Sequence, residues 1–568
     1  MMRLSAFPFA VLAAALLLSV PVMAASVLAP VAIDTQPVLP NQVLTEQILY
    51  QYLVAEIALQ RGQLNLASEA YLDLAKTTRD PRIAKRATEV ALYARQEPAA
   101  ETASKLWLDL NPQSIHARQA VVAILLESGK SADALPYLQQ LLSAHPDQAG
   151  VEFMQLGALL GDQPDKMMSL NLIQTLAAGY PALAEAHLAV AQAAARAGQF
   201  DLAAKELDTV ARLKPGWPVA ALLRFEILSR DGRADGEPFV QDYLKHYPDA
   251  SDVRLAYARY LLNQNRLPES RSQFEILAKT VPNSAAMYFA IGLISLQMNQ
   301  LDAADTAFKM ALQGNYADPG IVQIYLGQVA EARHDDAAAA NWYQSVSAGP
   351  QYITAQIKYA ILLTKQGKLA EARTYLHDVK VDNDADRVQL IQAEAELLGE
   401  AKDDQAAYQV LGDALRTRPD SIDLLYDHAM VAERLNHSDV LESDLRHLLQ
   451  LQPNHAQALN ALGYTLADHN VRLPEAVGLL EQALKLTPND AYILDSMGWA
   501  QYRLGKLATA EEYLNRAYHT LPDPEIAAHL GEVLWVQGNH AAAQQLWQTA
   551  LLVSPKNQAL LDVTAKFK

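Results

Sequence analysis

The chain has 568 residues and a formal charge of -18, and 51% of its residues are hydrophobic. This length exceeds what one hydrophobic core can serve, so we expect several domains or a repeat array. The chain contains no cysteine, which excludes disulfides, thiolate metal sites and cysteine nucleophiles. Its acidic charge argues against a protein that binds along a nucleic-acid backbone.

Residues 1–24 have the layout of an export signal. Arg3 provides a positive charge, and an apolar run extends from Phe7 to Val20. The run is shorter than the roughly 20 residues that a membrane-spanning helix needs, and Ala24 is a small residue suited to a cleavage site. We expect cleavage near Ala24 and a mature chain that is free in the periplasm, not a lipoprotein. Retention of the run as an uncleaved anchor stays open.

Residues 25–44 follow as a proline-containing segment. It includes Pro30, Pro37 and Pro40, with one acidic residue and no basic residue up to Gln42. Prolines favour extended backbone, so we expect an extended N-terminal tether here.

Prolines then recur at a constant spacing. Between Pro81 and Pro555, 474 residues divide into 14 steps, which gives a period of about 34. Within each step the apolar residues have helical spacing and are interrupted by one turn. The pattern predicts one pair of helices per period, about 15 pairs in all.

The period between residues 491 and 524 shows the physical logic of one pair. Gly505 separates two helices, and Gly498 and Ala510 lie where the two antiparallel helices approach most closely, so that a larger side chain would separate them. The small residue of the second helix recurs upstream, with Leu441 as the exception, at Ala67, Ala134, Ala203, Gly236, Ser270, Ala304, Ala339, Ala372 and Ala407.

This 34-residue pattern resembles the tetratricopeptide repeat family over nearly all of the mature chain. The resemblance implies an all-α fold, a right-handed superhelix (α-solenoid) of about 15 helix pairs that bury their apolar faces against neighbours. We expect an N-terminal array at 45–235, a C-terminal array at 236–555 and a capping helix at 556–568. The polar segment Arg230–Gly236 is the expected bend between the arrays.

Local patterns that are similar to catalytic or metal-binding motifs lack essential residues. Gly129–Ser131 is similar to the last three residues of a phosphate-binding loop, but Ile124 occupies the position of that loop's first glycine. Asp382–Asp386 is similar to a calcium loop, but Arg387 replaces the required glycine. Four histidines between residues 428 and 455 do not place three imidazoles on one helix face. We therefore expect no cofactor, no metal site and no enzymatic activity.

In this architecture the first helix of each pair lines a concave groove. Aromatic residues beside arginine, asparagine and acids in the last four periods predict a peptide-binding surface, because such side chains dominate binding hot spots. The candidates are Tyr426, Arg434, Asn460, Tyr464, Tyr492, Asp495, Trp499, Tyr502, Arg503, His529, Glu532 and Trp535. The alternative, that several of these aromatics pack between adjacent repeats, stays open.

The middle periods carry apolar residues at the same positions. These residues are Phe289, Leu293, Leu296, Ile321 and Ile324. They predict an apolar groove that could receive an amphipathic helix from a partner.

The segments 460–468, 493–499 and 523–535 resemble one bacterial group more closely. This group comprises the envelope tetratricopeptide proteins typified by the lipoprotein partner of a carboxyl-terminal processing protease. The resemblance implies a scaffold that brings a periplasmic protease to its substrates, which are murein hydrolases. The lipid-bearing cysteine of that group is missing here. An assembly factor for a secretion, pilus or exopolysaccharide export system stays open, as does a homo-oligomer.

Overall fold

The computed structural model describes residues 39–567 with the exception of 145, 162 and 231–234. The export signal predicted at 1–24, most of the tether at 25–44 and the centre of the predicted bend therefore lie outside the described residues. Within the described part the chain forms 31 α-helices and one short 3-10 helix, and no strands. The all-α fold of an α-solenoid is confirmed.

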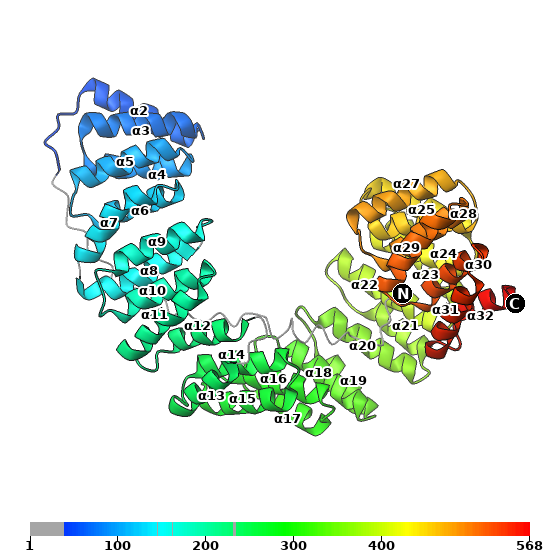
Figure 1. The fold of residues 1–568 in the computed structure, drawn as a ribbon. Coiled ribbons are helices and arrows are strands. Elements are labelled where there is room, and N and C mark those ends of the chain that lie inside the picture. Colours follow the sequence, from blue (N-terminus) through cyan, green and yellow to red (C-terminus); the bar gives the residue numbers. More distant parts are fainter. Residues whose placement is uncertain (1–38, 145, 162, 231–234, 568) are drawn as a thin grey trace. The chain divides into compact units, whose positions relative to one another are not determined.

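The chain divides into two compact units, Met1–Asn315 and Tyr316–Lys568. In the first unit, consecutive helices form eight pairs, which can be followed along the ribbon (Figure 1). Its helices are α2 (Glu46–Gln60), α3 (Leu64–Thr78), α4 (Pro81–Tyr93), α5 (Glu97–Leu110), α6 (Ile115–Glu127), α7 (Ser131–Ala144), η1 (Pro146–Gln148), α8 (Ala149–Gly161), α9 (Lys166–Ala177), α10 (Ala184–Arg196), α11 (Phe200–Leu213), α12 (Pro218–Leu228), α13 (Gly236–His246), α14 (Ser251–Asn263), α15 (Leu267–Thr280), α16 (Ala285–Gln297) and α17 (Leu301–Gln313).

The second unit contains seven pairs and a last helix, which brings the described total to the 15 pairs expected. The last helix, α32, packs against α30 and α31. The helices are α18 (Pro319–Ala332), α19 (Asp336–Ser345), α20 (Tyr352–Lys365), α21 (Leu369–Asp378), α22 (Asp384–Glu400), α23 (Asp404–Thr417), α24 (Ile422–Arg434), α25 (Ser438–Leu451), α26 (Ala456–Asp468), α27 (Leu473–Leu486), α28 (Ala491–Arg503), α29 (Leu507–Thr520), α30 (Pro524–Val536), α31 (His540–Val553) and α32 (Gln558–Lys566).

The boundary between the units follows α17, whereas the arrays predicted from the sequence meet between residues 235 and 236, immediately before α13. Residues 231–234 of the predicted bend are outside the described part. The bend therefore stays a prediction.

The periodic prolines mark the connections between pairs. Those from Pro112 to Pro555 each follow the second helix of a pair, and Pro81 is the first residue of α4. Proline has no backbone N–H and cannot continue a helix, but it is tolerated at a first helical position. The period read from the prolines is thus the period of the helix pairs.

In most pairs the turn contains a described residue in the left-handed region. After α28, Gly505 has φ +78°, and the Lys506 N–H donates to the Gln501 carbonyl at 2.9 Å. After α30, Gly538 has φ +90°. The hydrogen bond from Lys506 satisfies a carbonyl at the end of α28, and the left-handed backbone at Gly505 lets the chain reverse its direction. The helix break predicted at Gly505 is confirmed.

The two helices of a pair approach closely where a glycine faces a large side chain. A Cβ atom added to Gly498 would lie 2.5 Å from Leu514 Cγ, and one added to Gly531 would lie 2.0 Å from Trp547 Nε1. The small residues of the second helices are also fully buried. Ala67, Ala134, Ala203, Ser270, Ala304, Ala339, Ala372, Ala407, Ala476, Ala510 and Ala543 are all 0% exposed.

Apolar side chains join successive pairs. In the second unit one cluster of buried residues runs from Leu425 on α24 through Leu462 on α26 to Met497 on α28. Along this cluster each pair therefore buries its apolar surface against the next pair, as expected for a repeat array.

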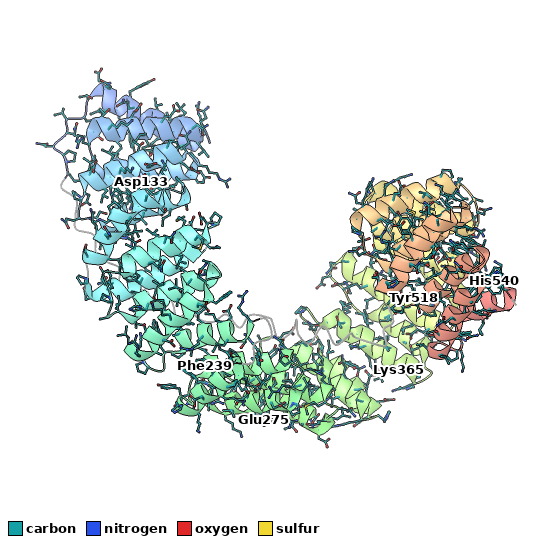
Figure 2. All side chains as sticks on the ribbon, in the orientation of Figure 1. Asp133, Phe239, Glu275, Lys365, Tyr518 and His540 are labelled. Carbon is teal, nitrogen blue, oxygen red and sulfur yellow. The ribbon has the colours of Figure 1, made fainter. Side chains whose placement is uncertain are left out.

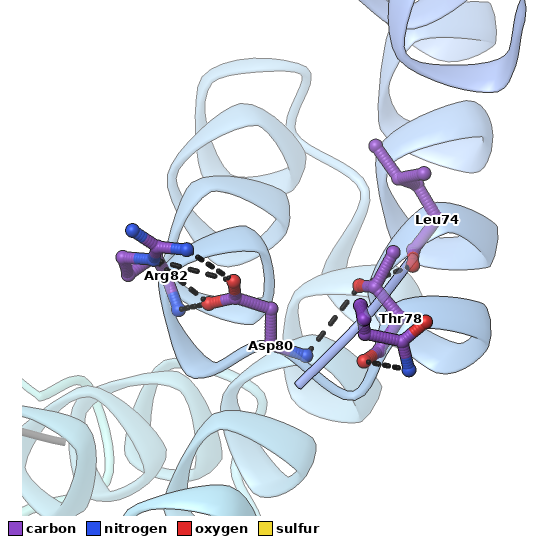
Figure 3. A network of polar contacts seen from close by, with 5 residues as sticks. Leu74, Thr78, Asp80 and Arg82 are labelled. Carbon is purple, nitrogen blue, oxygen red and sulfur yellow. Dashed lines mark hydrogen bonds and ion pairs between the residues drawn. The ribbon is translucent and has the colours of Figure 1, made fainter. Parts of the chain in front are cut away.

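A polar network fixes the connection between α3 and α4 (Figure 3). The Asp80 carboxylate accepts from the Arg82 N–H at 2.9 Å and from the Arg82 guanidinium at 2.7 Å. The hydrogen bond from the Arg82 guanidinium has the largest effect on the pKa of Asp80, and it lowers that pKa together with the hydrogen bond from the Arg82 N–H. The Thr78 hydroxyl donates to the Leu74 carbonyl at 2.8 Å. Both helix ends at this connection are thereby capped.

The apolar groove predicted in the middle periods is wrong for three of its five residues. Phe289, Leu293 and Ile324 are 5%, 0% and 2% exposed. The Phe289 ring lies 5.8 Å from the ring of Phe308, on the second helix of the same pair. These side chains form core, and an amphipathic helix from a partner cannot reach them.

The close approach at Gly531 gives a test with a matched control. Gly531→Ala is expected to destabilise the chain by about 2 kcal/mol, because Trp547 is 2% exposed and has no room to move. Gly478→Ala in α27 is expected to stabilise it by about 0.5–1 kcal/mol, because the new Cβ meets no atom within 4 Å. Urea unfolding followed by tryptophan fluorescence measures both; shifts of the same sign and size would contradict the packing argument.

Candidate peptide-binding face

The twelve candidate residues all lie on α24, α26, α28 and α30, the first helices of the last four complete pairs. We call this surface the C-terminal face. Along α28, Asp495, Trp499 and Tyr502 follow each other at spacings of four and three residues, which places them on one side of the helix. Because the pairs repeat with a period of about 34, the corresponding stripes of neighbouring helices lie side by side.

Trp499 links α28 to the preceding first helix. Its indole N–H donates to the Asp468 carboxylate on α26 at 3.0 Å, and the residue is 7% exposed. Arg503, one turn later, donates to the Asp468 carbonyl at 2.8 Å and to the Ala467 carbonyl at 3.3 Å. A cation is favourable at these carbonyls because they form the negative end of α26.

His529 links α30 to α28. Its Nδ1 lies 3.0 Å from both carboxylate oxygens of Asp495, and its ring stacks on Trp499 with centroids 4.3 Å apart. Burial lowers the pKa of His529, but the charge and hydrogen bond of Asp495, with the charges of Asp468 and Glu525, outweigh burial and raise it. The folded chain therefore favours the protonated imidazole.

Tyr502 and Glu532 connect the end of α28 to the last helix. The Tyr502 hydroxyl donates to Glu532 Oε1 at 2.9 Å, and Lys566 of α32 donates to the same oxygen at 2.8 Å. Burial, then the Glu532 charge and hydrogen bond, raise the pKa of Tyr502 to about 12. Glu532 is 7% exposed and thus joins three helices.

Trp535 belongs to an aromatic cluster at the end of the array. Its ring stacks on His540, labelled in Figure 2, at 4.2 Å. Trp547 lies 5.9 Å away and Phe567 5.8 Å away. Trp535 therefore packs between α31 and the C-terminal residues.

Other candidate residues remain accessible. Tyr492 is 55% exposed, and Tyr426 and Tyr464 are half-buried. The side-chain oxygen of Asn460, by contrast, is buried and has no hydrogen-bond partner among the described residues. Arg434 is paired with Asp404 at 2.7 Å. The structure thus separates the candidates into side chains that join repeats and side chains that could meet a partner.

The accessible part of the face is acidic. Burial, and then the charges of Asp468, Asp495 and other acids, raise the pKa of Tyr464. Burial also raises the pKa of Asp427 and of Glu433, although Glu433 is exposed to solvent.

Sequence reasoning missed the preceding first helix, α22. Glu396 lies 34 residues before Met430 and 68 before Tyr464, so it occupies the same position in its period. The spacing alone could have identified it. The contact between Gln392 and Asp427, at 2.7 Å, shows that α22 and α24 share this face.

The local motifs have structural roles. Gly129, with φ +71°, forms the turn between α6 and α7, and Lys130 pairs with Glu101 at 2.6 Å. Asn383 caps α22 by accepting from the Asp386 N–H at 2.8 Å. Gly129 therefore lies in a turn, whereas residues 384–386 form the beginning of α22.

Within the described part of the chain, no three histidine or acidic side chains are placed to hold a metal ion. No helix there is both long and apolar enough to cross a membrane.

The raised pKa of His529 predicts a stability that depends on pH. Because the folded pKa lies above the unfolded value, this group stabilises the chain fully below about pH 6.5, and the contribution is lost as pH rises through the folded pKa. The advantage of the wild type over His529→Gln in urea midpoint is therefore expected to shrink between pH 6 and 9. His519→Gln, on α29, is the control, and an advantage that does not change with pH would contradict the ion pair.

Comparison with known proteins agrees with this architecture. A model of the tetratricopeptide repeat family matches residues 255–320, 426–491 and 496–559. The chain is 34% identical over 490 residues to the TPR repeat-containing protein PA4667 of Pseudomonas aeruginosa, a match that spans 86% of this chain and 82% of that protein.

Several solved structures are similar at low identity. The structure of Naa15/Naa10 bound to HypK-THB matches 92% of this chain and 96% of its own, with 11% identity and a TM-score of 0.39. PilW, a widely conserved type IV pilus biogenesis factor, matches 38% of this chain and 100% of its own, with 17% identity and a TM-score of 0.32. TTC0263, a thermophilic TPR protein of Thermus thermophilus, matches 31% and 95%, with 23% identity and a TM-score of 0.28.

The helix pairs, the matched repeats and a relative aligned over most of both chains lead to one conclusion: this chain belongs to the tetratricopeptide repeat family.

Proposed function

We propose that this chain is a periplasmic adaptor that binds other proteins through its C-terminal face and catalyses no reaction. Tetratricopeptide repeat proteins bind other proteins, and the face supplies what such binding needs. The observation that carries the proposal is the accessible set Tyr426, Tyr464 and Tyr492 on helices that are fixed to one another by buried contacts. Rigid aromatic side chains contribute large contact areas at little entropic cost.

The inter-repeat contacts support this role because they hold the face in place before a partner arrives. Asp468 holds Trp499, Asp495 holds His529, and Glu532 holds Tyr502. A surface that is already ordered loses less entropy on binding than a flexible one.

As the finer part of the proposal, the partners are a carboxyl-terminal processing protease and the murein hydrolases that it degrades. The support is the resemblance of segments 460–468, 493–499 and 523–535 to the envelope proteins that assist such a protease. An adaptor that binds protease and substrate together raises their effective concentration and needs no chemistry of its own.

Co-purification from the native host tests the proposal. The full chain with a C-terminal tag is expected to be recovered from the periplasmic fraction, with a mass that begins at Ala25. A serine protease or a murein hydrolase is expected in the eluate. Tyr464→Ala/Tyr492→Ala is expected to reduce that recovery by about tenfold or more, because two accessible aromatics are lost.

The control is Tyr93→Ala/Tyr247→Ala, which removes two exposed tyrosines of the first unit. Circular dichroism checks that both variants keep their helicity. Equal losses in the two variants, or no loss in either, would place the binding surface elsewhere. An eluate with only secretion, pilus or polysaccharide-export components would overturn the protease link, and an eluate without partners would overturn the adaptor role.

A further inference from the structure

A cavity of about 570 Å³ lies in the second unit between α22 and the beginning of α24. This volume is within the usual range of ligand pockets, roughly 300–1,000 Å³. Its walls come from one side of α22 and from the connection between α23 and α24. The lining residues are Asp384, Ala385, Val388, Gln389, Gln392, Thr417, Arg418, Pro419, Asp420, Ser421 and Asp423.

The walls of the cavity carry an excess of negative charge. Arg418 is the cation among the lining residues, and its Nε lies 2.5 Å from the Asp384 carboxylate. Asp420 lies 3.0 Å from Nε2 of His447. The exposed Asp423 forms no ion pair within the described residues. The charge of the arginine is already neutralised, so the cavity remains acidic.

The acidic surface continues beyond the cavity. Gln392, at its edge, donates to the Asp427 carboxylate at 2.7 Å. Burial, followed by the charges of Glu400 and Asp427, raises the pKa of Glu396 to about 7. The pKa of Asp427 is raised as well, chiefly by burial. No described cation forms an ion pair with either carboxylate. The hydrogen bond from Gln392 and the charge of Arg434 offset the raised pKa of Asp427 only in part.

The surroundings favour a cationic side chain of a protein over other ligands. Most of the lining residues are polar or charged, which disfavours an apolar helix as the occupant. No three acids among the described residues are placed to hold a metal ion. A lysine or arginine side chain places its charge among carboxylates and packs its alkyl stem against apolar walls such as Val388 and Pro419.

We propose that the cavity between α22 and α24, together with the acidic surface beside it, receives a lysine- or arginine-bearing segment of a protein partner. Its cationic side chains meet Asp423 in the cavity and Asp427 and Glu396 beyond the edge of the cavity. The inference rests on the proposed protein-binding function, but it does not depend on which protein is the partner. It extends the C-terminal face by one helix, to α22, and makes positive charge the property that the partner must supply.

Fluorescence anisotropy with labelled peptides tests this charge preference directly. The probes are twelve-residue peptides of glycine, serine and tyrosine that carry four lysines, four arginines, four glutamines or four glutamates. The lysine and arginine peptides are expected to bind the full chain, and the other two are not. Glu396→Gln/Asp427→Asn is expected to weaken binding about tenfold, because two carboxylates that face the cation are neutralised at constant shape.

The matched control separates this site from the general attraction of an acidic protein. Glu481→Gln/Glu512→Gln changes the net charge by the same amount at two exposed glutamates on second helices, α27 and α29. It is expected to change the dissociation constant less than twofold. Equal weakening by both double variants would overturn the site, and so would equal binding of the glutamine and lysine peptides or binding of none.

Failure here is distinguishable from failure of the proposed function. In one outcome no basic peptide binds, but natural partners are still recovered and are lost with Tyr464→Ala/Tyr492→Ala. That outcome would support the adaptor role and contradict the charge preference. If basic peptides bind but no natural partner is recovered, the result would support the binding of cationic segments at the cavity and contradict the adaptor role.

Discussion

The structure depends on one steric constraint, which is the close approach of two antiparallel helices in each pair. Gly498 and Gly531 leave room for Leu514 and Trp547, and a buried small residue lies opposite on most second helices, with Leu441 of α25 as an exception. Because close contacts between small and large side chains recur along the array, they fix the rotation of the first helices about their axes. That rotation decides which residues face the neighbouring pair and which face solvent, so the candidate surface follows from the packing of the core.

The same rotation explains why the polar contacts of the C-terminal face run between repeats. A side chain at one position of a first helix reaches a side chain on the next first helix about 34 residues away, as Trp499 reaches Asp468 and Asp495 reaches His529. These contacts add to the apolar core that joins neighbouring pairs. Some residues of the C-terminal face therefore contribute both to the stability of the array and to the chemistry of its surface.

Much of the fold could be predicted because its signals are local and repeat: the prolines between pairs, the turn at Gly505, and the small residues at Gly498 and Ala510. The candidate site was less predictable. Whether a residue such as Trp499 faces a partner or a neighbouring repeat depends on how two pairs stack, which the pattern of a single period does not contain. For the same reason Phe289 was expected in a groove and lies in the core. The cavity beside α22 also needs the structure, because its walls combine one helix with a distant connection.

The division of the C-terminal face into joining and accessible residues has a consequence for how its specificity can diverge among relatives. A substitution at Asp495 changes the contact between α28 and α30 as well as the surface, because the Asp495 carboxylate pairs with His529. Such a substitution therefore affects the stacking of the repeats and the binding surface together. A substitution at Tyr492, which is 55% exposed, changes only the surface. A single substitution at an accessible position therefore alters the surface alone, whereas a substitution at a joining position also needs a compensating change in the residue that it contacts. The array can thus acquire new partners without losing the geometry that presents them.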